Sequence, residues 1–518
     1  MDIYAKQALD EYNSDTVTTR RGGNGKPFWN ANATQFLYAP AFQFMRILGC
    51  DKYIFTATDE EGKEYLFTAT SPTAALTPIW KEIPTGIVRL KVEADHKNTR
   101  YECGARTFFK ASPFPGRKNL PMKEVSYKEC ALKGLRFVFN DPITRNWLVE
   151  GLPKRDYYHS VYPSKMISAT VKALIVYAKL EPEHAQEAMK MAVNAADYLI
   201  SITYGDGSAL AGLPPTFSFK NIDRDIVRGA APVAEKREHT VMMIYPALVG
   251  NMYLELEKAT GDEKYFRMAE KIARYYQKNI LPNGSWYLLV SEKTGEPETR
   301  NCCCSFEIME FLNNFYQRTG EACWREIEKG YLSYIEKMCL DSYHWEGQFE
   351  DSEISDNHSN LSHYEADGMI RYITKRHTND ELKISVAEEL MRFVEDQFVV
   401  WEEFSPLNIH YDENNDDWYA PAGIEQYFWP VPIDASTASI AKSFLSLYKA
   451  TKKRIYLEKA YALGDAIAMR QNKETGVFPT HWMKKDCAEN LENFWMNCHV
   501  ASTLFLNELA DYEMEVGK

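Results

Sequence analysis

The sequence lacks the long runs and short motifs that identify several large classes of protein. It has no stretch of about 18 consecutive apolar residues, which a typical membrane-spanning helix requires. Residues 1–15 have neither the basic nor the apolar region of a secretory signal, so we expect a cytoplasmic location. No Gly-rich phosphate loop, HExxH motif or GxSxG motif occurs, which argues against nucleotide-binding proteins, zinc peptidases and α/β-hydrolases.

The sequence also has fewer positively charged than negatively charged residues. The chain has 60 Lys and Arg residues against 73 Asp and Glu residues, which gives a formal net charge of −13. An acidic surface is not attracted to nucleic acid or to an anionic membrane, so we expect neither partner. The charge does not argue against a small substrate, because small substrates respond to the local charge of their site.

Cysteines are few and irregularly spaced, apart from three consecutive ones at 302–304. Such spacing is untypical of a disulfide framework, so we expect reduced thiols. Three adjacent side chains on a helix point in different directions and chelate one zinc ion poorly. Glu298 with Cys323 or Cys498 could complete a zinc site, and the acidic stretch 412–417 could bind calcium, but we expect no metal and no cofactor.

The chain has the composition of a large globular protein. It contains 518 residues, of which 45% are hydrophobic and 26% are charged, so two domains or one large closed architecture are expected. Aromatic residues make up 13%, including 11 Trp and 32 Tyr. Most belong in a core, but such a surplus also suits a carbohydrate-binding cleft, because an aromatic face packs against the C–H face of a sugar.

The N-terminal quarter has the alternating pattern of β-strands. The segments 52–59 and 64–71 flank a short turn, and the segments 86–94 and 106–112 continue the alternation of apolar and polar residues. We therefore predict a small antiparallel β-sandwich, similar to a fibronectin type III domain, over residues 1–135.

The remaining residues, 136–518, predict paired helices with partly repeated sequences. The predicted pairs are 163–179 with 183–201, 240–258 with 260–276, 303–317 with 319–335, 361–375 with 380–397, 435–449 with 451–467, and 494–513 with 142–150. Links within the pairs are short and links between them are long. A ring of such hairpins, an (α/α)6 barrel, gathers the long links at one end, where they would form a site. An open solenoid of helical repeats, which would serve as an interaction scaffold, is the alternative fold.

Carboxylates on the long links are candidates for glycoside hydrolysis, which needs two carboxyl groups beside the scissile bond. We favour Glu238 and Glu365 as the acid/base pair, with Glu350 in reserve because it directly follows a Gly-x-aromatic element. Asp351, Glu298 and Asp434 lie on the same predicted face. For Asp434 and its neighbours Ser436 and Thr437, helix capping is the favoured interpretation.

Other polar and aromatic residues lie at the predicted starts of the inner helices and could bind substrate. If the substrate is a uronate, Arg237 and Arg300 could hold its carboxylate through a bidentate fork. Trp286, Trp495 and Tyr157 could stack on a sugar. The remaining candidates for substrate contacts are His159, His239, His363 and Tyr364.

Four segments carry a resemblance to a known family: 28–44 (FWNANATQFLYAPAFQF), 211–217 (AGLPPTF), 428–438 (FWPVPIDASTA) and 494–501 (FWMNCHVA). In these segments and in its layout, nearly the whole chain resembles glycoside hydrolase family 154, the β-glucuronidases with an (α/α)6 barrel. The resemblance implies exo-acting hydrolysis of terminal β-linked glucuronic acid, without a cofactor, in a homo-oligomer. It does not identify the catalytic pair.

A second class of enzyme shares this fold and remains open. In a polysaccharide lyase or a uronate epimerase, Tyr157 or Tyr364 and His239 or His363 would remove the C5 proton, and no carboxyl pair would be required.

Overall fold

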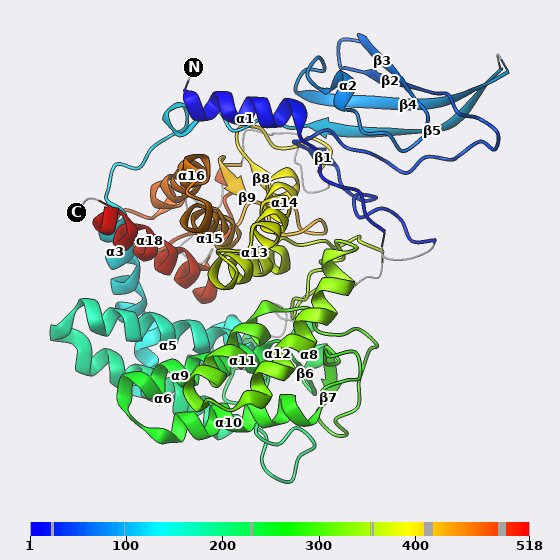
Figure 1. Ribbon diagram of the computed structural model, residues 1–518. Helices are drawn as coiled ribbons and strands as arrows, with labels where there is room; N and C mark the ends of the chain where they lie inside the picture. Colours follow the sequence, from blue (N-terminus) through cyan, green and yellow to red (C-terminus); the bar gives the residue numbers. More distant parts are fainter. Residues whose placement is uncertain are drawn as a thin grey trace.

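The computed structural model describes residues 2–21, 25–97, 99–227, 232–352, 354, 357–408, 418–484 and 494–516. Most of these residues form helices, and a small sheet lies at one side of the helical body (Figure 1). None of the described helices is both long enough and apolar enough to cross a membrane.

An inner ring of helices forms the centre of the described structure. Each inner helix contacts the next along the chain, and the last contacts the first, so the ring closes. The members are α5 (Pro163–Leu180), α9 (Tyr245–Thr260), α11 (Phe306–Thr319), α13 (Tyr364–Arg376), α15 (Asp434–Thr451) and α18 (Met496–Val516). Closure rules out the open solenoid.

Each inner helix is covered by an outer helix, which confirms the predicted (α/α)6 barrel. The outer helices are α6 (Ala185–Ile202), α10 (Glu263–Lys278), α12 (Ala322–Ile335), α14 (Glu381–Phe398), α16 (Arg454–Arg470) and α3 (Tyr127–Asn140). One predicted pairing was wrong. The helix that covers α18 is α3, whereas α4 (Pro142–Val149) packs against α6 and α3.

The short links between paired helices follow from their residues. Gly261 and Gly320, which end α9 and α11, both adopt φ near +72°. This left-handed conformation is nearly free of strain for glycine and reverses the chain within a few residues. The Asp262 side chain then accepts a hydrogen bond from the Lys264 amide and caps α10.

The N-terminal strands form one five-stranded sheet. Its order is β1 (Gln35–Phe36), β5 (Thr99–Lys110), β4 (Gly86–His96), β2 (Tyr53–Thr58) and β3 (Glu64–Ala69), and the neighbours are antiparallel except for β1 with β5.

The small predicted sheet is therefore present, but in the described residues no second sheet faces it. The short helix α2 (Thr77–Trp80) instead covers its apolar face, where Trp80 stacks on Phe108 with ring centroids 6.1 Å apart. Tyr12, on α1 (Ile3–Ser14), packs against the same indole.

The sheet is fixed to the barrel by buried polar contacts. The backbone amides of Leu37 and Tyr38 donate to Asp396 on α14, at 2.6 and 2.8 Å. On the other side, Arg117 forms an ion pair with the buried Asp465 of α16 at 2.7 Å. Figure 1 shows α1 lying above α16, in agreement with their contacts.

Candidate active site

The starts of the inner helices meet at one end of the barrel, as the alternation of links predicted. The Tyr158 ring, before α5, lies 6.2 Å from that of Trp495, before α18. The Tyr364 hydroxyl, at the start of α13, lies 3.2 Å from the Ser436 hydroxyl in the first turn of α15. Polar and aromatic side chains from far-apart parts of the chain therefore share one region.

Glu350 lies fully buried at the centre of this region. One of its carboxylate oxygens accepts a hydrogen bond from Lys165 Nζ at 2.6 Å, and the other accepts one from the Tyr245 hydroxyl. Lys165 is in the first turn of α5 and Tyr245 begins α9. Burial alone would raise the pKa of Glu350, but Lys165 and Tyr245 together lower it, so the carboxylate stays ionised.

Two further carboxyl groups share the same cation and respond in the opposite direction. Asp351 is exposed at the surface, but the protein atoms around its carboxyl group reduce its hydration, and this effect, followed by the charge of Glu350, raises its pKa to about 6. Burial, followed by the charge of Asp351, raises the pKa of Glu425 to about 8. The acid cluster, which we define as Glu350, Asp351, Glu425 and Lys165, therefore holds carboxyl groups in different protonation states near neutral pH. Such a separation of pKa values is typical of acid/base sites.

Arg237 holds the backbone of the acid cluster in place. Its guanidinium donates to the carbonyl oxygens of Glu350 and Ser352, at 2.9 and 3.1 Å. The ring of Phe349 packs edge-on against that of Tyr364, with centroids 5.6 Å apart. Arg237 thus lies beside the site, but the structure gives it a positioning role and not an unoccupied fork for a uronate.

An aromatic wall borders Lys165. The Lys165 ammonium lies over the ring of Trp495, 4.9 Å from the ring centroid. The ring centroids of Trp495 and His159 are 3.8 Å apart. His159 is buried, and neither ring nitrogen has a hydrogen-bond partner among the described residues. Burial, followed by the charge of Lys165, holds the pKa of His159 well below its usual value, so the imidazole is neutral. Trp495 is the predicted platform that lies at the acid cluster.

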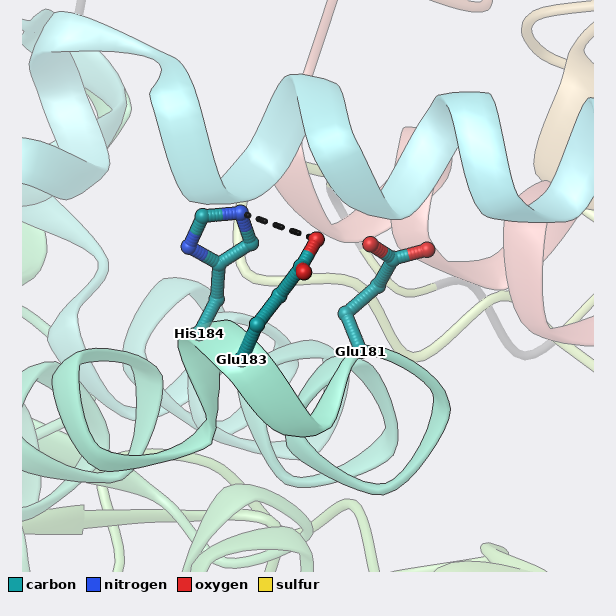
Figure 2. Close-up of side chains that lie close together, drawn as sticks. All are labelled: Glu181, Glu183 and His184. Atoms are coloured by element: carbon teal, nitrogen blue, oxygen red, sulfur yellow. Dashed lines mark ion pairs between the residues drawn. The ribbon is translucent and has the colours of Figure 1, made fainter.

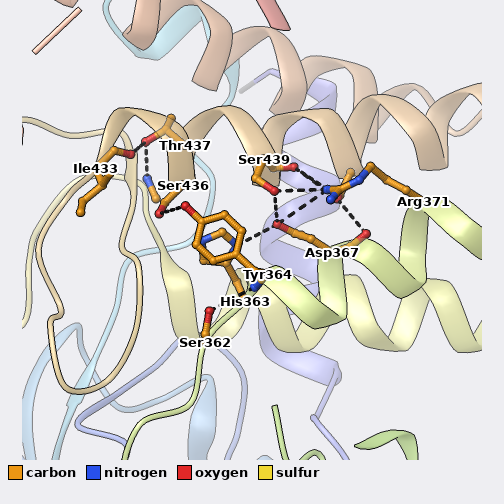
Figure 3. A network of polar contacts seen from close by, with 11 residues as sticks. Ser362, His363, Tyr364, Asp367, Arg371, Ile433, Ser436, Thr437 and Ser439 are labelled. Carbon is orange, nitrogen blue, oxygen red and sulfur yellow. Dashed lines mark hydrogen bonds and ion pairs between the residues drawn. The ribbon is translucent and has the colours of Figure 1, made fainter. Parts of the chain in front are cut away.

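A histidine–carboxylate pair lies behind Tyr364 (Figure 3). The His363 ring nitrogen Nδ1 is 2.7 Å from Asp367, which also accepts a hydrogen bond from Ser439 at 2.9 Å. The other ring nitrogen, Nε2, has no partner among the described residues. Arg371 approaches the same carboxylate at 4.0 Å. His363 is thus fixed in one orientation.

The two favoured carboxylates lie apart from these contacts. Glu238 forms an ion pair with Arg224 at 2.5 Å, and the neighbouring His239 is exposed and pairs with Glu292 at 3.0 Å. Glu365 begins α13, where burial, followed by the charge of Glu307, raises its pKa to about 8. The structure brings neither of them into contact with Glu350.

The remaining predicted residues have diverse surroundings. Trp286 is 1% exposed and packs between Tyr276 and Tyr331, within the core. The Tyr157 hydroxyl accepts a hydrogen bond from the Met496 amide at 3.4 Å, and Arg300 lines a separate groove.

Helix capping, the interpretation favoured for Asp434, Ser436 and Thr437, is not what the structure shows, because the cap position of α15 is Ile433 and no side chain caps this helix. Asp434 accepts from the Ala435 amide, and Thr437 donates to the Ile433 carbonyl and accepts from the Gly423 amide, as Figure 3 shows for Thr437.

Sequence reasoning did not single out Lys165, Tyr245 or Glu425, and it passed over Asp351 in favour of other carboxylates. Asp351 and Glu350 are adjacent in the sequence, a signal that could have favoured both. Lys165 and Tyr245 each lie within two residues of a proline in the first turn of an inner helix. Glu425 is half-buried, and nothing in its local sequence indicates that it lies near Asp351.

The cysteines do not form a metal site in the described part of the chain. Cys304 forms a disulfide with Cys339, which corrects the expectation of reduced thiols for this pair, whereas Cys302 and Cys303 are free. The pairing is possible because Cys304, just before α11, lies next to Cys339, which follows α12. The stretch 412–417, considered for calcium, lies outside the described residues.

Glu181, Glu183 and His184 are close enough together to hold an ion (Figure 2). They lie in the short link between α5 and α6, where Glu181 already pairs with Arg136 at 2.8 Å. Exposed groups of this kind are common without a metal, so this cluster is not a candidate site.

Comparisons with known proteins support the fold. No family model matches the chain, and no curated protein matches it. Cellobiose 2-epimerase from Spirochaeta thermophila is similar in structure, with a TM-score of 0.52 at 12% identity, over 75% of this chain and 98% of that one.

Two further solved structures have lower scores. A family 76 glycoside hydrolase from a bovine Bacteroides thetaiotaomicron strain has a TM-score of 0.49 at 10% identity, over 89% of this chain and 93% of that one. Unsaturated glucuronyl hydrolase from Streptococcus agalactiae has a TM-score of 0.48 at 11% identity, over 75% and 93%. At these identities the likeness concerns the fold, and the chemistry depends on the residues of the site itself.

Proposed function

We propose that this protein is a glycoside hydrolase whose chemistry takes place at the acid cluster. The observation that carries the proposal is the separation of pKa values among three neighbouring carboxyl groups around Lys165. Hydrolysis of a glycosidic bond needs one carboxyl group that keeps its proton and one that is ionised. Glu425 and Asp351 meet these two requirements near neutral pH.

In the proposed reaction, Glu425 gives its proton to the glycosidic oxygen as the bond from that oxygen to the anomeric carbon breaks. Ionised Asp351 stabilises the positive charge that develops on the sugar ring. Water then adds to the anomeric carbon and gives a proton to the Glu425 carboxylate, which restores the acid. Glu350 and Lys165 form a fixed ion pair that sets the field in which the other two groups titrate. Trp495 supplies an apolar face for the sugar.

The proposed substrate is a terminal β-linked glucuronic acid. Lys165 supports this choice because its ammonium carries three donors, and the bond to Glu350 uses one of them. The resemblance of residues 428–438 and 494–501 to family 154 supports the same choice, since these segments flank α15 and α18 at the site. The resemblance also implies an oligomer, which size-exclusion chromatography with light scattering measures.

The test compares nitrophenyl β-glucuronide with nitrophenyl β-glucoside, which differ only in the carboxylate at C6. We expect release of nitrophenol from the glucuronide, and a loss of about 10²- to 10⁴-fold in kcat/KM for Glu425→Gln and for Asp351→Asn. Glu238→Gln and Glu365→Gln serve as matched controls that remove a carboxylate outside the acid cluster. If Glu425→Gln keeps its activity while Glu238→Gln and Glu365→Gln lose theirs, the acid/base pair is Glu238 and Glu365, as favoured from the sequence.

An epimerase acting on a uronate or a related sugar is the second candidate. It is favoured by the orientation of His363, whose Nδ1 is held by Asp367 while Nε2 has no partner among the described residues. The structural likeness to cellobiose 2-epimerase also supports a carbohydrate substrate. Incubation of the sugar in D2O distinguishes the two reactions, because an epimerase that removes a carbon-bound proton places deuterium on the sugar, and a hydrolase releases an alcohol instead.

A further inference from the structure

A groove of about 680 Å³ is lined in part by Gln348, two residues before Glu350 in the sequence. It is bordered by residues 282–284 and 300–304, by the last turn of α12 with the residues that follow it, and by the segment 344–348. This volume is within the range of small-molecule sites, about 300–1,000 Å³. The groove is large enough for a disaccharide.

Two cations line this groove without an anionic partner. Arg300 and Lys337 are both exposed, and neither side chain makes a hydrogen bond or an ion pair with another described residue. Many other cations of this acidic chain have an anionic partner; Lys329 on α12, for example, pairs with Glu326 at 2.8 Å. Two unpaired cations facing one groove favour an anionic ligand.

The rest of the lining is polar and aromatic. Tyr334, Asn283 and Gln348 border the groove, and Gln348 is fixed by hydrogen bonds to the backbone of Cys302 and Cys304. These groups suit a ligand with many hydroxyl groups.

One carboxylate also lines the groove, but it is occupied. Glu346 accepts a hydrogen bond from the Asn360 amide at 3.1 Å and lies 3.9 Å from His344. The two cations Arg300 and Lys337 outnumber this one carboxylate, so the charge of the lining is positive.

We propose that this groove binds an acidic sugar unit of a glycan, with Arg300 and Lys337 holding its carboxylate. That the anion belongs to a carbohydrate rests on the proposed function. The segment 344–350 connects the two places, because Gln348 lines the groove and Glu350, two residues later, lies in the acid cluster. The groove would thus recognise a charged unit of the glycan at a place separate from the reacting bond.

A free thiol in the groove gives a local readout of binding. Cys302 is half-buried and lines the groove, whereas Cys323 on α12 is also half-buried but does not line it. The full-length protein is treated with iodoacetamide, and alkylation of both thiols is followed by mass spectrometry. The probes are cellobiouronate and cellobiose, which differ by one carboxylate, and the alkylated protein carries Glu425→Gln so that the proposed hydrolysis does not consume the first probe.

We expect cellobiouronate to slow alkylation of Cys302 at least about tenfold more effectively than cellobiose, because only cellobiouronate has a carboxylate that can contact the two cations. Neither sugar should affect alkylation of Cys323. Arg300→Met with Lys337→Met should abolish this difference, and Lys329→Met should preserve it. Equal protection by both sugars, no protection by either, or protection that persists in the double variant would overturn the proposal.

This measurement needs no turnover, so it separates the groove from the proposed function. Protection by cellobiouronate in a protein that hydrolyses no glycoside would support the groove and contradict the hydrolase. Hydrolysis of the nitrophenyl glucuronide without selective protection of Cys302 would support the hydrolase and contradict the groove.

Discussion

The ion pair between Lys165 and Glu350 connects stability with catalysis at the scale of single residues. Both side chains lie at the barrel mouth, and Glu350 has no exposed surface. Lys165→Met would leave a buried carboxylate without its cation, which costs about 3–5 kcal/mol of unfolding free energy. Urea denaturation followed by circular dichroism measures this loss.

Two comparison variants make this prediction specific. Lys165→Met with Glu350→Met should recover most of the stability, because no unpaired charge remains in the interior. Lys329→Met breaks a surface pair, which should cost less than about 1 kcal/mol. A cost for Lys165→Met no larger than that of Lys329→Met would contradict the burial of the pair.

The raised pKa values predict the pH profile of hydrolysis. Asp351 must lose its proton, so kcat/KM should rise through pH of about 6, and Glu425 must keep its proton, so kcat/KM should fall through about 8. Asp351→Asn should remove the acidic limb from whatever activity remains, and Glu425→Gln should remove the alkaline limb. Initial rates measured over pH 4–10 in overlapping buffers check both predictions. If the acidic and alkaline limbs of the profile are unchanged in these variants, other groups are responsible for the titration.

The alternation of short and long links predicted the end of the barrel where the inner helices begin, whereas the catalytic roles of individual residues stay predictions. Glu350 could be found because the Gly-x-aromatic element before it indicates an inward-directed extended piece. Lys165 and Glu425 could not, since both depend on which face of a helix or loop turns toward Glu350. That information lies in contacts between segments about 185 residues apart.

At the scale of elements, the contact between α11 and α13 depends on Gly368. A Cβ at this position would lie 2.5 Å from the Phe306 Cβ, so Gly368→Ala should destabilise the protein by about 1–3 kcal/mol. Helix propensity alone predicts the opposite sign, a gain of about 1 kcal/mol. The sign of the change in unfolding free energy therefore distinguishes packing from propensity.

Gly330 on α12 provides the matched control for this prediction. A Cβ there meets no atom within 4 Å, so Gly330→Ala should stabilise the protein by about 0.5–1 kcal/mol. A stabilising effect at both positions would show that α11 and α13 are packed less tightly than the structure describes.

The paired helices could be predicted from the sequence, and α3 shows where such prediction fails. Its Ser126 cap and the apolar residues Cys130, Leu135 and Val138 are an ordinary helix signal. The strands that come just before it lead to a predicted boundary at residue 135, which falls inside α3. Only the contact of α3 with α18, near the other end of the chain, shows that it belongs to the barrel.

At the scale of the whole molecule, ring closure predicts a compact particle. A globular chain of this length has a radius of gyration of about 24 Å, whereas an open helical superhelix of the same length is markedly larger. Small-angle X-ray scattering on the monomeric fraction measures this quantity. A much larger radius with an elongated distance distribution would contradict the closed barrel.

The closure of the ring by α18 has a consequence for synthesis. The ribosome delivers α5 early, but its neighbour on one side is α18, which emerges more than 300 residues later. Until the final segment is released, the apolar edges of α5 and α15 remain uncovered and are available to chaperones or to other nascent chains. A ribosome that stops shortly before residue 496 would leave an assembled sheet and an unclosed row of hairpins, with no complete pocket.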